Sequence, residues 1–515
     1  MKKLSLPLIK QAFISYMYIL KHFCVLLFVL VITLNTSAQM PPKREFRGTW
    51  VQTVGQGKYA KMSQQEMKTY FINLLDGFQK DGINVVLFQI RPEADAWYDS
   101  PYEPWSRYIT GVQGQNPGWD PLAFLVKECH KRNIDIHAWL NPYRARSTPG
   151  NKLSKNHIFY KHPDWFINYG NYLWFDPGNP ACREFIKTVV RDIVKRYDID
   201  AIHMDDYFYP YPIVESQFND SKSFLTYGLA KGFTANQKAD WRRDNINSLI
   251  RELHEVVHST KPWVEFGVSP FGIYRNKRND PKGSQTNGLS NYDDLFADII
   301  YWLKMGWVDY NIPQLYWEIG HRVADYEVLL EWWSENSYNI PLYIGQDVLR
   351  TLRPDSLKHN QLHRKMLLAS ENSKVTGNCF WPGYELERNA GGVADSLRKV
   401  YHKYPALHPA NNSFDQTPPK SVRNLVYLKN KDNSLLLSWD APISKLEMDK
   451  AVNYVIYRFD SMGDIDLEDP RNIVSISQET KFTIPKKTPP HKVYVITALD
   501  RCHNESRGEF IEVPE

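Results

Sequence analysis

The stretch IDAIHMDDYFYPYP at residues 199–212 shows which fold to expect. It opens with an apolar, β-branched run, reaches two adjacent carboxylates, Asp205 and Asp206, and continues into an aromatic loop. A short apolar run of this kind is typical of a buried strand, and polar residues at its carboxyl end are typical of parallel barrels that carry a reaction site. The stretch therefore predicts a buried parallel strand with chemistry at its end.

Seven other runs share this pattern, and helical periodicity lies between consecutive runs, for example at residues 64–80 and 238–259. The eight runs are FRGTWVQTV at 46–54, NVVLFQIR at 84–91, DIHAWLNPY at 135–143, AIHMDDYF at 201–208, WVEFGVSPFG at 263–272, DYNIPQLYW at 309–317, PLYIGQDV at 341–348 and GNCFWPGY at 377–384. They predict an α/β protein with a (β/α)8 TIM barrel over residues 45–404. An open doubly wound sheet is the alternative, but the sequence has no glycine-rich phosphate-binding turn after its first strand.

The alternation of strand and helix patterns ends after Tyr404. Residues 405–419 are rich in Pro and Asn without periodicity and are predicted to be a linker. Short alternating strands without helices follow over 420–515 and predict a small all-β sandwich. The sandwich resembles a fibronectin type III module, in which Trp439 and Tyr494 would be core residues. Such modules space or dock enzymes, so contact with envelope proteins through this one is a hypothesis.

The N-terminal segment 1–38 has the features of a secretory signal: four lysines, no acid, an apolar run at 23–34 and Thr-Ser-Ala before the expected cleavage point. The apolar run is short for a bilayer span, so we expect export to the periplasm or cell surface with no stable membrane span after cleavage. Met17 is an alternative translation start. Without the four lysines the formal net charge of +5 falls to about +1, so nucleic acid is not an expected partner.

Asp205 is the first candidate catalytic residue. Strand alternation places it on one face with His203 and Tyr207, and places Asp206 on the other face, so that only one set is expected to face the barrel mouth. Adjacent Asp residues are often merely solvated or cap a helix, but here they end a buried strand. A carboxylate in this setting can stabilise an oxocarbenium-like centre or activate water, provided that a second carboxyl group acts as acid. The ranked candidates for that group are Glu318 and Asp206, followed by Glu93 and Asp347.

Residues suited to holding sugar hydroxyls and rings stand at the other strand ends. Amide, imidazole and guanidinium groups exchange hydrogen bonds with hydroxyls, and Trp and Tyr rings stack on sugar faces. Each residue alone is as easily explained by barrel packing, so their joint occurrence is the signal. The expected substrate-binding residues are Gln89, Arg91, Glu93, His137, Trp139, Asn141, His203, Tyr207, Ser269, Gln314, Tyr316, Trp317, Asp347 and Trp381.

A metal-dependent mechanism is another hypothesis, with His137, His203 and Asp205 as the metal ligands. These residues lie far apart in sequence and form no tight motif such as H-x-H, so no catalytic metal and no cofactor are predicted. A metal-dependent carbohydrate deacetylase and a non-catalytic glycan-binding barrel remain alternatives to a glycosidase. Serine chemistry is disfavoured because Ser269 stands in no G-x-S-x-G motif.

The chain also resembles a known family, glycosyl-hydrolase-like family ten, a group of exported bacterial barrels. The matching stretches are EFRGTWVQTV at 45, NVVLFQIRPEADAWYDSPYEPWSRYITG at 84, DPLAFLVKECHKRNIDIHAWLNPYR at 120, WFDPGNP at 174, DAIHMDDYFYP at 200, GVSPFGIYR at 267 and QLYW at 314. The resemblance implies a TIM barrel that hydrolyses glycosidic bonds, with peptidoglycan-type glycan strands as the expected substrate.

Strand four is also similar to that of alpha-amylase and alpha-galactosidase-type barrels, in which an Asp at the position of Asp205 is the nucleophile. Strand five departs from that pattern, because it ends in Ser269-Pro270-Phe271 and lacks the acid found there. The acid/base assignment of those enzymes therefore does not transfer. A substrate-assisted mechanism, with Asp205 and Asp206 orienting and protonating, remains open.

Overall fold

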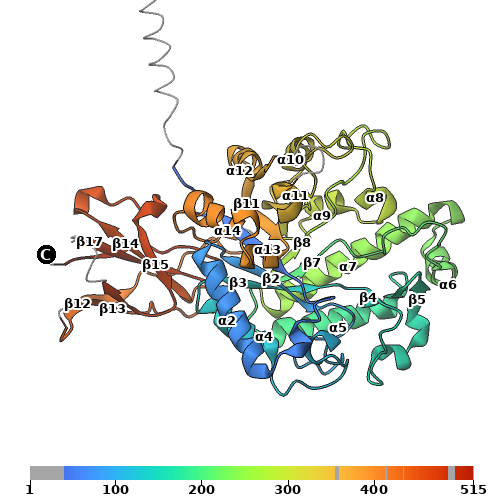
Figure 1. Cartoon of the computed structure of the whole chain (residues 1–515), viewed down its shortest axis with the longest axis horizontal. Helices are drawn as coiled ribbons and strands as arrows, with labels where there is room; N and C mark the ends of the chain where they lie inside the picture. The colour runs from blue at the N-terminus through green and yellow to red at the C-terminus, as the bar shows by residue number, and fades with distance from the viewer. Residues whose placement is uncertain (1–39, 354–358, 412–413, 433, 485–492, 514–515) are drawn as a thin grey trace, which may run out of the picture. The chain divides into compact units, whose positions relative to one another are not determined.

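The computed structural model describes residues 40–353, 359–411, 414–432, 434–484 and 493–513; the expected signal segment 1–38 lies outside them. Eight parallel strands close into a barrel, so the open-sheet alternative is wrong and the predicted TIM barrel is confirmed (Figure 1). In order around the barrel they are β1 (Phe46–Val51), β2 (Val85–Arg91), β3 (Asp135–Leu140), β7 (Ala201–Met204), β8 (Glu265–Val268), β9 (Tyr310–Asn311), β10 (Leu342–Asp347) and β11 (Val375–Trp381).

Alternation along each barrel strand separates two cores. On β3, His137 and Trp139 face the barrel interior, while Ile136, Ala138 and Leu140 pack outward against helices. The interior is filled mainly by large side chains, because a closed eight-stranded barrel leaves room for packed layers and no pore. The interior cluster is Phe46, Trp50, Val85, Leu87, Trp139, Ala201, Tyr310, Ile312, Tyr343 and Cys379.

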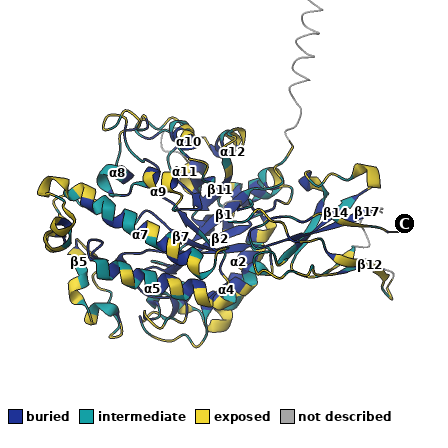
Figure 2. Cartoon of the chain, turned by 180° about the vertical axis from the view of Figure 1, so that it is seen from behind, coloured by how far each residue is buried: buried dark blue, intermediate teal, exposed yellow. Residues whose placement is uncertain are grey.

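Helices cover the outside of the barrel, with buried faces toward the strands and exposed faces toward solvent (Figure 2). The longer ones begin with side-chain caps where the sequence supplies them; Ser63 and Glu66, for example, form a reciprocal capping box at the start of α2. The helices are α2 (Gln64–Lys80), α3 (Arg107–Thr110), α4 (Pro121–His130), α5 (Pro180–Arg196), α6 (Ser221–Ser223), α7 (Lys238–Thr260), α8 (Asn291–Asp294), α9 (Ile299–Met305), α10 (Tyr326–Glu335), α11 (Val348–Leu352), α12 (Leu362–Glu371), α13 (Gly383–Glu387) and α14 (Val393–Ser396).

Two further observations concern the described residues as a whole. None of their helices is both long enough and apolar enough to cross a bilayer. Cys129, Cys182, Cys379 and Cys502 are buried and form no disulfide with one another.

A small antiparallel sheet interrupts the connection between β3 and α5. It consists of β4 (Arg144–Arg146), β6 (Tyr172–Phe175) and β5 (Phe166–Tyr169), in that order. Sequence patterning did not predict it, because the three strands are short. Its first strand positions Arg144 beside the end of β3.

The C-terminal residues form a small all-β domain of two antiparallel sheets. One sheet has the order β12 (Arg423–Lys429), β13 (Leu435–Asp440), β16 (Lys481–Ile484). The other has the order β15 (Ile473–Ser477), β14 (Asn453–Phe459), β17 (Val493–Leu499), β18 (Glu509–Glu512). Trp439 and Tyr494 lie in the core between the sheets, as predicted. The resemblance to a fibronectin type III module stays a prediction.

This β-domain contacts the N-terminal ends of the barrel strands, opposite to the strand ends that carry the predicted chemistry. Arg501 pairs with Asp198 at 2.7 Å and His503 with Asp135 at 3.0 Å. In the segment 405–419, expected to be a linker, Leu407 and His408 are buried and Asn411 donates to Glu265 at 2.7 Å. Part of that segment is therefore packed between barrel and β-domain.

Replacing Gly267 with alanine is expected to destabilise the barrel. A Cβ at this position of β8 would lie 1.9 Å from the Tyr310 ring, which is buried and hydrogen-bonded to His137. We expect the free energy of unfolding to fall by about 1–3 kcal/mol, the usual penalty of overpacking. Gly77→Ala in α2 is the control, since its Cβ meets nothing within 4 Å. Urea unfolding should show that variant as neutral or stabilised; an equal loss in both would contradict the account.

Candidate active site

A cavity of about 390 Å³ opens at the carboxyl ends of the barrel strands. Most of the residues that strand-end reasoning selected meet there, although they come from six strands. Because parallel strands in a closed barrel end on the same face, side chains distant in sequence converge at this mouth. The predicted residues that line the cavity are Gln89, Trp139, Asp205, Asp206, Tyr207, Ser269, Gln314, Tyr316, Trp317 and Trp381.

Asp205 and Asp206 both line the cavity, although alternation predicted that only one would. That expectation is wrong because β7 ends at Met204, so the backbone no longer alternates as a strand beyond it. His203, still within β7, does point into the barrel interior. The chain thus leaves the strand one residue before the first carboxylate and presents two acids to one space.

Three donors surround the Asp205 carboxylate. Trp139 Nε1 donates at 3.0 Å, Asn141 Nδ2 at 2.5 Å, and the backbone N–H of Tyr207 at 3.2 Å. The Asn141 amide can adopt only this orientation, because its Oδ1 already accepts from Gln89 and Arg144, each at 2.6 Å. Burial raises the pKa of Asp205, while the Arg144 charge and these donors act against that rise. The carboxylate form is the one that this environment supports.

Asp206 has a different environment. It accepts hydrogen bonds from Tyr211 and Gln314. Burial, together with the charge of Asp205, raises the pKa of Asp206 to about 7. Two adjacent buried carboxyl groups cannot both ionise easily, and the donors around Asp205 and the Arg144 charge favour Asp206 as the group that holds a proton. One acid and one base therefore stand side by side.

His203 and His137 form a packing layer below the cavity floor. His203 contacts Ser269 Oγ at 2.9 Å and Trp50 Nε1 at 3.3 Å, and both imidazoles share the Tyr310 hydroxyl, at 3.1 and 2.7 Å. Burial lowers the pKa of both, to about 3 for His137, so both are neutral. Among the described residues, the groups of converging metal ligands include neither of them.

Five other predicted residues lie outside the cavity lining. Asn141 does not line the cavity but donates a hydrogen bond to Asp205. Arg91 is buried in an ion pair with Glu103 at 2.6 Å, and Glu93 pairs with Arg107 at 3.4 Å. Asp347 caps α11 by accepting from the Arg350 N–H at 2.8 Å.

Glu318, the first-ranked partner acid together with Asp206, is the fifth. It is buried after β9, on the side of Lys365, and does not line the cavity.

A second buried acid pair shows why a raised pKa alone does not identify a reaction site. Burial and the nearby Glu93 raise the pKa of Asp95 to about 7, as in Asp206. Asp95 nevertheless accepts from Gln113 and from the Glu93 N–H, away from the cavity. Cavity position separates the two pairs.

Sequence reasoning missed several cavity residues. Arg144 and Tyr211 lie beyond their strand ends, in the conspicuous stretches NPYR and YPYP, and Arg350 belongs to a helix. The missed lining residues are Trp50, Gln52, Val54, Arg144, Tyr211, Phe271 and Arg350. It also missed a metal-binding pattern, His-Glu-Val-Val-His at 254–258 on α7, although H-E-x-x-H is readable directly from sequence.

The raised pKa of Asp206 predicts a pH-dependent stability effect. In the unfolded chain this carboxyl ionises near its ordinary value of 3.8, whereas in the folded chain it ionises near 7. The folded state therefore loses stability as pH rises from about 4 to 7. Asp206→Asn removes this effect, so its free energy of unfolding relative to the parent should rise by up to a few kcal/mol between pH 4 and 8. Urea titrations at both pH values test this, with exposed Asp164→Asn as control. A pH-independent difference would contradict it.

Comparison with known proteins agrees with this geometry. A family model described as Glycosyl hydrolase-like 10 matches residues 45–361. The chain is 40% identical over 494 residues to glycosyl hydrolase YngK of Bacillus subtilis, covering 93% of this chain and 95% of that protein. It is 37% identical over 338 residues to glycosyl hydrolase DigH of Escherichia coli K12, covering 61% and 75%.

Among solved structures, the glycoside hydrolase domain of PgaB from Bordetella bronchiseptica aligns with a TM-score of 0.48 at 12% identity, covering 70% of this chain and 99% of that one. The family match spans most of the barrel, including the strand end that carries Asp205 and Asp206. The chain therefore belongs to the glycosyl hydrolase-like 10 family.

Proposed function

We propose that this protein is an exported glycoside hydrolase that cleaves a bacterial envelope or extracellular glycan, with peptidoglycan-type glycan strands as substrate. The observation that carries the proposal is a pair of carboxyl groups in one cavity: the pKa of Asp206 is raised to about 7, while hydrogen-bond donors and the Arg144 charge oppose the rise in the pKa of Asp205. Glycoside hydrolysis needs a protonated and an ionised carboxyl near the same bond. Family membership supports the reaction class, and the expected signal segment supports export.

Asp206 is proposed as the general acid. Its proton passes to the glycosidic oxygen as the bond to the anomeric carbon breaks, so that the leaving sugar departs as an alcohol. The Asp205 carboxylate faces the positive charge that develops on the anomeric carbon. A water molecule then adds its oxygen to that carbon, and its proton returns to the carboxyl pair. The atoms balance as one water consumed per bond broken.

The remaining lining residues are proposed to hold the sugar chain. The rings of Trp139 and Trp381 contact edge to face, with their centroids 6.0 Å apart. The ring of Trp317 packs against Phe271, with a centroid distance of 5.2 Å. Such rings present apolar faces to sugar rings, while Gln314 and Ser269 offer groups to the hydroxyls. The two kinds of contact together favour a carbohydrate over an apolar ligand.

Removing either carboxyl is expected to abolish the reaction. Asp205→Asn and Asp206→Asn should each lower kcat at least 10²–10⁴-fold, the range that general acid–base catalysis contributes. New reducing ends and mass spectrometry of products from peptidoglycan, from glycan stripped of stem peptides, and from common polysaccharides measure this. Glu318→Gln is the matched control, since Glu318 is buried outside the cavity.

The alternatives give distinct results in the same assay. Folded Asp205→Asn and Asp206→Asn variants with full activity would overturn the site assignment. Sugar binding without turnover would point to a glycan-binding barrel. Release of acetate that stops after chelation would indicate a deacetylase.

Arg144 is expected to set the acidic limb of the pH profile. Its charge opposes the rise in the pKa of Asp205, so Arg144→Met should raise that pKa further and move the acidic limb of kcat/KM toward higher pH. Arg144→Lys keeps the charge and should largely restore the parent limb. Identical acidic limbs in all three proteins would show that Arg144 acts only as packing.

A further inference from the structure

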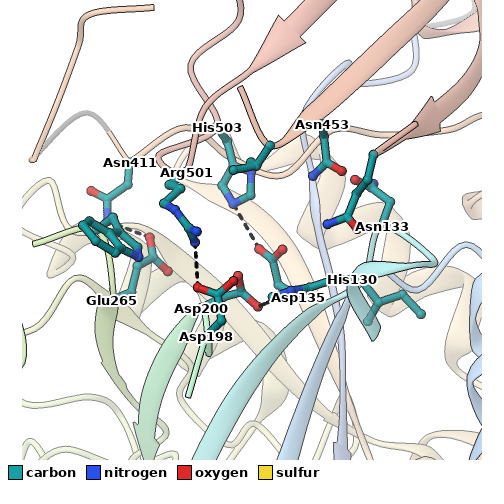
Figure 3. Close-up of a pocket in the computed structure, with 14 residues that line it drawn as sticks. His130, Asn133, Asp135, Asp198, Asp200, Glu265, Asn411, Asn453, Arg501 and His503 are labelled. Carbon is teal, nitrogen blue, oxygen red and sulfur yellow. Dashed lines mark hydrogen bonds and ion pairs between the residues drawn. The ribbon is translucent and has the colours of Figure 1, made fainter. Parts of the chain in front are cut away.

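A second cavity, of about 190 Å³, lies at the opposite end of the barrel, where the strands begin. The barrel contributes Asp135, Asp200 and Glu265 to it, and the β-domain contributes Arg501 and His503 (Figure 3). No part of the proposed reaction uses these groups. They nevertheless form a buried polar cluster between two parts of the fold, which requires a physical explanation.

Several of these polar groups are paired with a group of opposite charge or with a carboxylate. Arg501 pairs with Asp198 at 2.7 Å, and His130 pairs with Asp200 at 2.9 Å. Asp135 is different, because two imidazoles converge on one of its oxygens. His408 Nδ1 lies 2.9 Å and His503 Nε2 lies 3.0 Å from Asp135 Oδ2.

The imidazole rings of His408 and His503 make their one polar contact to Asp135 Oδ2 among the described side chains. They stack at 4.5 Å with an interplanar angle of 13°, and among the described residues His408 Nε2 and His503 Nδ1 have no hydrogen-bond partner. Without a metal, each ring must direct an N–H at the same carboxylate oxygen. One divalent cation bound by both nitrogens and the carboxylate would replace the two protons.

The geometry suits tetrahedral coordination. At metal–ligand distances of about 2.0–2.1 Å, neighbouring ligand atoms of a tetrahedral ion lie roughly 3.3 Å apart. The two nitrogen–oxygen separations, 2.9 and 3.0 Å, need to widen by only a few tenths of an ångström. All three ligand atoms lie within 4.8 Å of one another.

We propose that Asp135, His408 and His503 bind a divalent transition-metal ion, Zn²⁺ by their ligand chemistry. Two imidazole nitrogens and one carboxylate oxygen are a common zinc set, which a water molecule completes as fourth ligand. Asp135 and His503 also line the cavity. Asp135 begins β3, His408 follows the barrel, and His503 lies between β17 and β18. The ion therefore fixes the β-domain and the connecting segment to the barrel.

The H-E-x-x-H pattern of α7 provides an internal comparison. His254, His258 and Asp309 also lie within reach of one ion. There, however, Asp309 Oδ2 is already engaged by the backbone N–H of Phe266 at 2.6 Å and by His258 at 3.1 Å. The described contacts bring only one of those imidazoles within hydrogen-bond distance of the carboxylate, so the Asp135 site is the better formed.

Zinc content and thermal stability test the proposal. The purified chain, stripped with a chelator and reloaded with zinc chloride, should retain one zinc per molecule after gel filtration, measured by mass spectrometry. Its melting temperature should rise with zinc and fall again with chelator, because a ligand that binds only the folded state stabilises it. Asp135→Asn and His503→Gln should lose both the bound zinc and the stabilisation, and His258→Gln should keep both.

Two results would overturn the proposal. One is a parent chain that retains no zinc and melts at the same temperature with and without it. The other is zinc that His503→Gln retains and His258→Gln loses, which would assign the ion to α7. Cobalt(II) loading of the parent chain gives a reading that needs no variant: tetrahedral coordination produces intense visible absorption, and a spectrum of hexaaqua cobalt alone would contradict the site.

Discussion

An ionised carboxylate buried at the end of β7 is the constraint on which the active-site architecture depends. Asp205 is only 4% exposed, and a buried charge is tolerated only when it is well compensated. The compensation comes from three parts of the chain: Trp139 and Asn141 at the end of β3, the Tyr207 backbone, and Arg144 from the following small sheet. The loops beyond these strands are shaped by that requirement.

The compensation extends through a chain of amides. Gln89 accepts from the backbone N–H groups of Thr53 and Val54 at 2.8 Å, and so must donate its own N–H to Asn141. Asn141 must then direct its N–H at Asp205. Each amide orientation determines the next, so the loop that follows β1 is linked to the carboxylate that follows β7. A network of this kind holds a reactive group in one geometry before substrate arrives.

The sequence predicted the fold well because the strand ends carry a strong pattern. Seven of the eight barrel strands fall within the runs that apolar character and strand-end chemistry selected, and β11 begins two residues before its run. The helix α2 matches its predicted bounds. The short elements were missed: β4 and β5 have too few residues for periodicity, and β15 and β18 show weak alternation in the β-domain.

The site was less predictable because strand alternation gives the direction of a side chain only for residues within the strand. It placed His203 on the same strand face as Asp205, and His203 does face the barrel interior. It wrongly separated Asp205 from Asp206, because β7 stops at Met204. It also could not distinguish Asn141, which reaches Asp205 but does not line the cavity, from residues that touch the cavity. Tertiary compensation of charge, as by Arg144, is invisible without the fold.

The central claim is that Asp205 and Asp206 act on the same glycosidic bond. A crystal structure of Asp206→Asn with a peptidoglycan-type oligosaccharide tests it most directly. The account predicts a glycosidic oxygen within hydrogen-bond distance of the residue 206 carboxamide, with the adjoining anomeric carbon next to the Asp205 carboxylate. A sugar chain bound in the cavity with its glycosidic oxygens out of reach of both side chains would contradict it.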